Sequence, residues 1–96
     1  EEVVDRMCHS PATNFNISKR GFLREGYYAD LVILNPEMED TVSTKKPAYK
    51  CGWSPLENIN LKSTVVHTFV NGLQVVENSK LTGVTAGKKL TFEYGK

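Results

Sequence analysis

Residues 63–78 have the sequence STVVHTFVNGLQVVEN, which contains the strongest local folding signal in the chain. Two runs rich in β-branched residues, 63–70 and 73–78, lie on either side of the dipeptide Asn71-Gly72. Both residues of this dipeptide tolerate the positive φ that a type I′ turn requires, and such turns join antiparallel strands. The pattern therefore predicts a β-hairpin.

Further short strands are predicted on both sides of the hairpin. Residues 29–36 form an aliphatic run that an Asn-Pro pair ends, which predicts a strand buried on both faces. Residues 41–43 predict a weaker strand, and the alternation of polar and apolar residues over 89–94 predicts a half-exposed closing strand. We expect residues 45–60 to be irregular and residues 81–87 to form a loop.

The first fifteen residues predict a pair of helices with a kink between them. The apolar residues of the first helix share one side, and they are Val3, Val4, Met7 and Cys8. Ser10-Pro11 is typical of an N-cap followed by proline at the first helical position, so a second short helix is expected through Phe15. The two glycines within residues 21–28 predict a tight turn or bulge.

Helices that precede the strands, instead of alternating with them, predict an α+β fold that is mostly β. We expect an N-terminal helix pair followed by a small β-sandwich-like set of about five short strands. With 96 residues, the chain is too short for an eight-fold β/α barrel, which needs ~200 residues. A chain of this size buries only ~60–70% of its unfolded surface, which leaves room for a partner surface.

Charge and hydropathy exclude several classes of partner. Twelve basic residues face eleven acidic ones, without the clustered positive charge that nucleic acid requires. The longest apolar run is residues 31–34, whereas a membrane span needs ~18–20 residues. Residues 1–5 lack the features of a signal peptide, which predicts a cytoplasmic protein or a trimmed chain. No nucleic acid and no membrane are expected as partners.

The chain offers few residues for chemistry. Zinc could be imagined on Cys8, His9, Cys51 and His67, but no C-x2–4-C or H-x3–5-H spacing is present. We therefore expect packed, reduced thiols and ordinary histidines. Cys51 has no base nearby in sequence, so catalysis by this thiol is not expected. No catalytic, cofactor-binding or metal residue is predicted in this segment.

Two further features have simple structural interpretations. Asp30 directly precedes the aliphatic run, where a carboxylate more often accepts backbone N–H groups of a turn than acts as a base. Gly21 and Gly26 are not followed by the Lys-Ser/Thr pair of a phosphate-binding loop. These glycines therefore predict a turn and not a nucleotide site.

Four stretches taken in order resemble the C-terminal end of a dihydroorotase, a cyclic amidohydrolase. They are EEVVDRMCHSPA (residues 1–12), GFLREGYYADLVIL (21–34), KCGWSPLE (50–57) and VVHTFVNG (65–72), the last followed by Leu73 and Val76. The second stretch matches a Gly-x-Ile-x-x-Gly-x-x-Ala-Asp-Leu-Val pattern that many amidohydrolases share. KCGWSP narrows the resemblance to dihydroorotases.

The resemblance implies a fold and a place for the chemistry. It implies that residues 1–17 are the last helices of a β/α barrel's outer layer and that 18–96 are the C-terminal part of a composite β-sandwich. In this family, zinc or another divalent metal is bound by histidines, a carboxylated lysine and an aspartate, all upstream of such a segment. His9 matches a family position that we expect to be structural. The resemblance implies that strands from the N-terminus of the parent complete the sandwich, and we expect none of them in this segment.

The leading hypothesis is a C-terminal dihydroorotase fragment, itself structural and non-catalytic, whose partner is the missing barrel. The parent would interconvert N-carbamoyl-L-aspartate and dihydroorotate. Two alternatives are a stand-alone non-catalytic binding or assembly module and the C-terminal end of a hydantoinase or allantoinase. Self-association is expected as well, because unpaired strand edges recruit partners.

Overall fold

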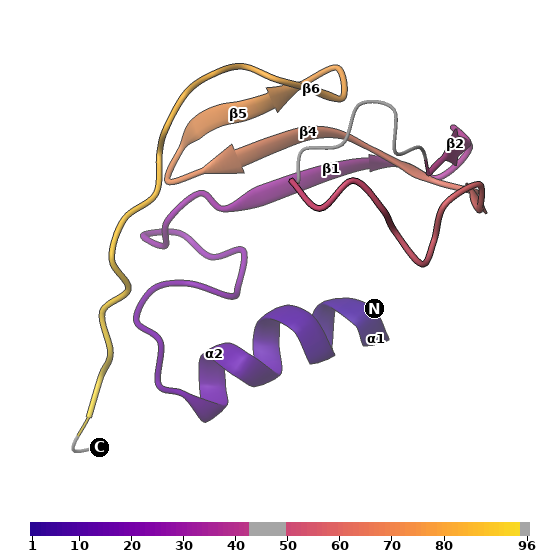
Figure 1. The fold of residues 1–96 in the computed structure, drawn as a ribbon. Helices are drawn as coiled ribbons and strands as arrows, with labels where there is room; N and C mark the ends of the chain where they lie inside the picture. Colours follow the sequence, from indigo (N-terminus) through magenta and orange to yellow (C-terminus); the bar gives the residue numbers. More distant parts are fainter. Residues whose placement is uncertain (43–49, 95–96) are drawn as a thin grey trace.

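A helical segment precedes an antiparallel sheet in the computed structural model, which describes residues 1–42 and 50–94 (Figure 1). The helical segment comprises α1 (Glu2–Val4), a π-helical turn (Asp5–His9) and α2 (Ser10–Asn14). The strands are β1 (Leu31–Asn35), β2 (Asp40–Thr41), β3 (Asn60–Leu61), β4 (Thr64–Val70), β5 (Leu73–Glu77) and β6 (Lys80–Leu81). The predicted fold class, α+β with strands dominating, is confirmed.

The helical segment is continuous, which differs from the predicted helix pair. Ser10 has helical φ and ψ of −61° and −46°, so it is not the predicted N-cap, and its N–H donates to the carbonyl of Asp5, five residues back. Pro11 lacks an N–H, and its ring crowds the carbonyl four residues earlier. The chain accommodates this proline by widening the turn before it into a π-helix instead of kinking.

The hairpin predicted at Asn71-Gly72 is confirmed. Strands β4 and β5 pair antiparallel, and Val70 lies opposite Leu73 across the two-residue turn. The φ values of Asn71 and Gly72 are 52° and 82°, both in the left-handed region that a type I′ turn uses. The backbone preferences of Asn71 and Gly72 therefore determine this part of the sheet.

A second tight turn follows directly at Asn78 and Ser79, between the predicted strand run 73–78 and the predicted loop 81–87, where no turn was predicted. Asn78 and Ser79 have φ values of 49° and 64°, and β6 folds back onto β5 beyond them. Ser79 is held there by two hydrogen bonds to β4: its amide donates to Val66 O and its hydroxyl to Val65 O, each over 2.9 Å. The two-residue strand is too short to produce a periodic signal.

The predicted aliphatic strand is confirmed as β1, but its predicted burial on both faces is wrong. β1 pairs only with β4, in a four-stranded sheet of order β1-β4-β5-β6. Val32 and Leu34 are 58% and 57% exposed. A strand buried on both faces needs layers above and below it, and the described residues place none over these side chains.

The C-terminal segment does not form the strand predicted over residues 89–94. It makes a single antiparallel bridge, Ile17 to Phe92, to the loop that follows the helix. Two backbone hydrogen bonds of 2.8 Å support the bridge, from Ser18 N to Thr91 O and from Glu93 N to Asn16 O. Alternating polar and apolar residues form a β-ladder only where a neighbouring strand pairs with them in register, and here the pairing is a single bridge.

A separate two-stranded ladder joins β2 and β3, with Asp40 opposite Leu61. β2 lies where the weaker strand was predicted, although Ser43 of that prediction lies outside the described residues, as do residues 45–49 of the predicted irregular stretch. Residues 50–59 contain no strand, as predicted, and β3 begins at Asn60. The described strands therefore form one four-stranded sheet and one two-stranded ladder.

Candidate functional site

Cys8, His9, Cys51 and His67 were considered as zinc ligands. Three of them contact other groups. The His9 ring stacks on the Phe22 ring with centroids 4.3 Å apart, and His67 Nδ1 lies 3.1 Å from the Gln74 side-chain amide. The Cys51 thiol lies 3.5 Å from the carbonyl of Trp53. Within residues 1–42 and 50–94, no three histidine, cysteine or acidic side chains lie close enough to hold a metal ion.

Both cysteines are free and exposed, so the prediction of packed thiols is wrong. Cys8 lies in the π-helical turn, and Cys51 lies in the irregular stretch before β3. Both segments are at the surface because the described residues provide no layer over them. Exposure by itself does not make a thiol a nucleophile, which also needs a base or a positive environment.

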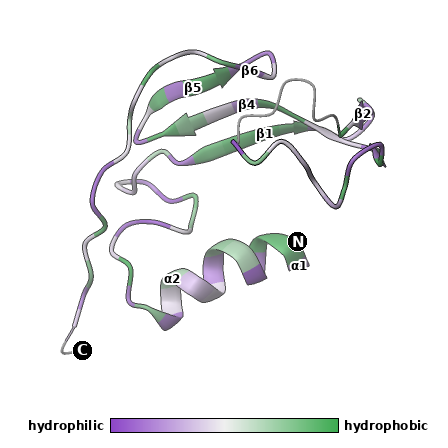
Figure 2. Cartoon of the chain, viewed as in Figure 1, coloured by the Kyte–Doolittle hydropathy of each residue, from purple (hydrophilic) through white to green (hydrophobic). Residues whose placement is uncertain are grey.

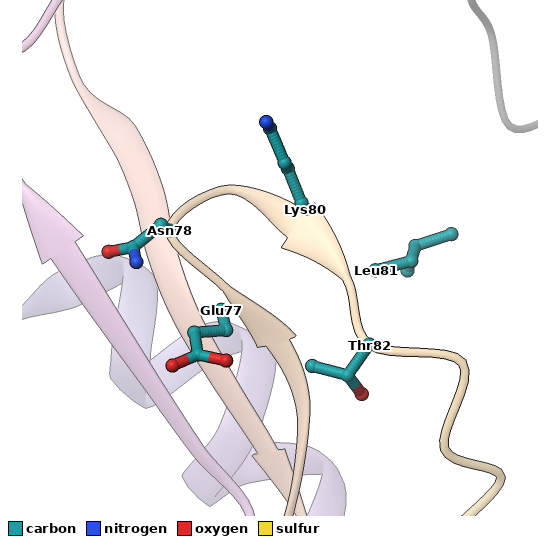
Figure 3. A pocket seen from close by; sticks show the side chains of 5 residues that line it. All are labelled: Glu77, Asn78, Lys80, Leu81 and Thr82. Atoms are coloured by element: carbon teal, nitrogen blue, oxygen red, sulfur yellow. The ribbon is translucent and has the colours of Figure 1, made fainter.

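The hollow at the tip of the second turn is open and chemically simple (Figure 3). Its lining residues are Glu77, Asn78, Lys80, Leu81 and Thr82. The side chains of Glu77 and Lys80 point in different directions (Figure 3). A carboxylate and an ammonium group that point away from each other cannot act together as a nucleophile and a base. We therefore assign no chemistry to this hollow.

A second hollow lies between the end of the helical segment and the following loop. Arg20 and Arg24 contribute to its lining, together with Glu93 from the C-terminal segment. The Arg24 guanidinium lies over the Phe22 ring, 4.1 Å from its centroid. Because these cations are engaged by aromatic rings or carboxylates, the hollow is a packing junction and not a substrate site.

Asp30 caps a turn, as predicted, through one of its two carboxylate oxygens. Oδ1 accepts the backbone N–H of Asn71 over 2.8 Å, at the tip of the β4–β5 hairpin. Oδ2 lies 2.5 Å from Arg20 Nη1, an ion pair that no local sequence signal indicates. Arg20 comes from the loop after the helix, so this contact depends on how the chain folds back.

The sheet carries exposed apolar side chains. By the register of β1, β4, β5 and β6, one face of the sheet carries a set of exposed aliphatic side chains, here called the apolar sheet face. Its members are Val32, Leu34, Val65, Leu73 and Leu81, with exposed fractions from 42% to 76%. Figure 2 shows hydrophobic residues in green along β1 and in parts of β4 and β5.

The helical segment has an uncovered surface of its own. Val3, Val4 and Met7 are three of the four residues of the predicted stripe, and they are 67%, 48% and 74% exposed. We call these three residues the apolar helix stripe. Among the described residues, only Ala12, Ala86 and Thr64 are buried. None of the helices described is long and apolar enough to cross a membrane.

The accessible surface of the chain quantifies this lack of cover. It measures 8060 Å², whereas a folded monomer of 10.8 kDa exposes about 5,500 Å² by mass scaling. An excess of about 2,500 Å² on one partner corresponds to about 5,000 Å² buried on both partners together, the upper part of the range for obligate interfaces. The described residues therefore form a β-rich segment with a large uncovered surface.

Comparison with known proteins identifies relatives of this segment. The chain is 29% identical to the dihydroorotase of Pyrococcus horikoshii over 92 residues and 31% identical to that of Thermococcus kodakarensis over 94 residues. These alignments cover 96% and 98% of the chain but 22% and 23% of the relatives. The Clostridioides difficile dihydroorotase is 36% identical over 78 residues, 81% of the chain and 18% of that protein.

The chain thus spans about a fifth of the length of the curated relatives it matches. No family model matches it. The chain is similar to a segment of dihydroorotases, and this similarity confirms the resemblance seen in the sequence motifs. Its coverage is consistent with a C-terminal segment.

Proposed function

We propose that this chain is the C-terminal segment of a dihydroorotase, a hydrolase of pyrimidine biosynthesis. The complete enzyme would interconvert N-carbamoyl-L-aspartate and dihydroorotate in the cytoplasm. Similarity to dihydroorotases over nearly the whole chain supports this assignment. A hydantoinase or allantoinase origin is less favoured, because the relatives reported above are all dihydroorotases.

Within that enzyme, the segment would be structural and non-catalytic. Residues 1–17 would complete the outer layer of the barrel, and residues 18–96 would form the C-terminal part of a composite β-sandwich. The excess of about 2,500 Å² of accessible surface carries this proposal, because it requires a cover as large as an obligate interface. The barrel would cover the apolar helix stripe, and the missing strands would cover the apolar sheet face.

The metal that dihydroorotases imply does not fit the residues described here. Histidine, cysteine and carboxylate groups fail to converge in threes anywhere in residues 1–42 or 50–94. A zinc ion that activates water needs three or more protein ligands. Zinc or another divalent metal would therefore be bound by upstream residues of the parent, and no catalytic step is assigned to this chain.

A stand-alone binding or assembly module is the second candidate function. The same uncovered surfaces favour it, since a separate partner protein could bury them as well as a covalently linked domain could. The two candidates differ in what the gene encodes. A module would be translated from a start codon near Glu1, whereas a dihydroorotase segment would follow a long coding region.

The test compares the 96-residue chain with the complete translation product of its gene. Both are purified and assayed for dihydroorotate hydrolysis and for bound metal. We expect turnover and stoichiometric metal in the complete product and neither in the isolated chain. Turnover by the isolated chain would contradict the non-catalytic role, and a complete product of about 96 residues would favour the module. A long product without dihydroorotase activity would overturn the assignment of the reaction.

A further inference from the structure

One carboxylate links the helical side of the molecule to the sheet. Asp30 directly precedes β1, and its two oxygens contact different parts of the chain. Oδ2 lies 2.5 Å from Arg20 Nη1, and Oδ1 accepts the Asn71 N–H over 2.8 Å. We call Arg20, Asp30 and Asn71 the Asp30 junction.

The Arg20 end of the junction is attached to the helical segment. Gly21, with φ of 85°, lies so close to the helix that a Cβ atom there would collide with the Ala12 Cβ and lie 2.7 Å from the carbonyl oxygen of Cys8. The next residue, Phe22, stacks on His9 with an interplanar angle of 6°. Residues 20–22 must therefore move with the helix.

The Asn71 end of the junction is attached to the sheet and to the C-terminal segment. Asn71 occupies the tight turn between β4 and β5, and its side-chain Nδ2 donates to Ala86 O over 2.5 Å. The neighbouring Gly72 N–H bonds Ala29 O over 3.0 Å. Ala86 is one of the few buried residues, so this end of the junction is firmly packed.

The ion pair is better shielded than an ordinary surface pair. The side chain of Arg20 is 11% exposed, that of Asp30 is 35% exposed, and the guanidinium lies 4.0 Å from the centroid of the Tyr28 ring. Exposed pairs contribute little to stability, but a largely desolvated arginine is costly to leave without its partner. The pair therefore favours one arrangement of the two segments.

We infer that Asp30 is a positioning residue that fixes the orientation of the apolar helix stripe relative to the apolar sheet face. Oδ1 holds the hairpin turn, and Oδ2 holds the helix through Arg20. Figure 1 shows residues 15–30 running between the helix and the sheet, which is the region that the junction spans. If the proposed function holds, the same contact orients the barrel-facing helix against the sandwich.

The experiment uses the 96-residue chain and makes two separate measurements. One reports the orientation of the helix relative to the sheet, and the other reports how well the Asn71 amide in the turn is protected from exchange. Spin labels are placed on Cys8 and on Glu77→Cys, with Cys51→Ser, and the distance distribution between them is recorded. Amide hydrogen exchange of Asn71 is measured in parallel. The variants are Asp30→Asn and Asp30→Ala, and the matched control is Glu25→Gln, an exposed acid of the same loop.

Asp30→Asn keeps an oxygen acceptor for the Asn71 N–H but removes the charge that holds Arg20. We expect it to broaden the distance distribution while Asn71 exchange stays within about threefold of the parent chain, less than the loss of a hydrogen bond would give. Asp30→Ala removes both contacts and should broaden the distribution and speed Asn71 exchange roughly tenfold. Glu25→Gln should change neither.

An unchanged distance distribution in both Asp30 variants would overturn the inference and leave Asp30 as a turn cap alone. If Asp30→Ala does not fold, Arg20→Met supplies the decisive measurement, because it removes the charge contact and leaves Oδ1 on the turn. Broadening in Arg20→Met supports the inference, and an unchanged distribution contradicts it. None of these measurements reads dihydroorotase turnover, so a failed activity assay would bear on the proposed function alone.

Discussion

The Nδ1 atom of His67 on β4 lies 3.1 Å from the side-chain amide nitrogen of Gln74 on β5. The backbone N–H of Asn78 also points at this ring nitrogen, over 3.3 Å. Two donors that converge on one nitrogen require it to be an acceptor, so the proton of the neutral ring belongs on Nε2. His67 thus fastens the second tight turn to the sheet.

This arrangement predicts the tautomer of His67. Nitrogen chemical shifts of the 96-residue chain should show that the neutral imidazole of His67 is protonated at Nε2. Gln74→Leu removes one donor and should leave the tautomer in place through Asn78, with a loss of about 1 kcal/mol in the free energy of unfolding. A ring protonated at Nδ1 in the neutral form would contradict this assignment.

Gly21 and Gly26 provide a matched pair for testing close packing at the helix. Both have positive φ, 85° and 83°, but a Cβ atom would collide only at Gly21, since nothing lies within 4 Å at Gly26. We expect Gly26→Ala to lower the free energy of unfolding by roughly 1–2 kcal/mol and Gly21→Ala by roughly 2–5 kcal/mol. Urea denaturation measures both, and equal losses would show that the helix is not held by this contact.

The apolar sheet face predicts self-association of the 96-residue chain. Exposed apolar patches and unpaired strand edges lead to association, so sedimentation coefficients should rise with concentration. Leu34→Lys places a charge on this face and should weaken the association. Leu23→Lys is the control, because Leu23 is 80% exposed but lies in the loop. An equal effect of both variants would mean that the sheet face is not the contact.

The reactivity of the two free thiols tests where the rest of the complete protein packs against this segment. In the 96-residue chain, Cys8 and Cys51 are both exposed, so both should react with a thiol reagent in the native state. In the complete protein, Cys8 should be protected at least about tenfold, because its helix would pack against the barrel and reaction would require local opening. Unprotected Cys8 in the complete protein would count against the proposed placement of residues 1–17.

Local chemistry made several elements predictable. The type I′ turn at Asn71-Gly72 follows from the backbone freedom of those two residues, and β1 follows from an aliphatic run ended by Asn-Pro. The helix was located correctly, but its continuity through Pro11 was not, because widening into a π-turn is a response of the whole helix. The turn-capping role of Asp30 was predicted, whereas its ion pair with Arg20 was not.

The amino-acid sequence by itself determined where the hairpin, β1 and the helix form, since backbone preferences act between neighbouring residues. It also carried the motifs that dihydroorotases share. Only the tertiary structure decided the Ile17–Phe92 bridge, the partners of Asp30 and the exposure of the aliphatic side chains in β1. Those features depend on which distant segments meet, and burial depends on every layer that surrounds a side chain.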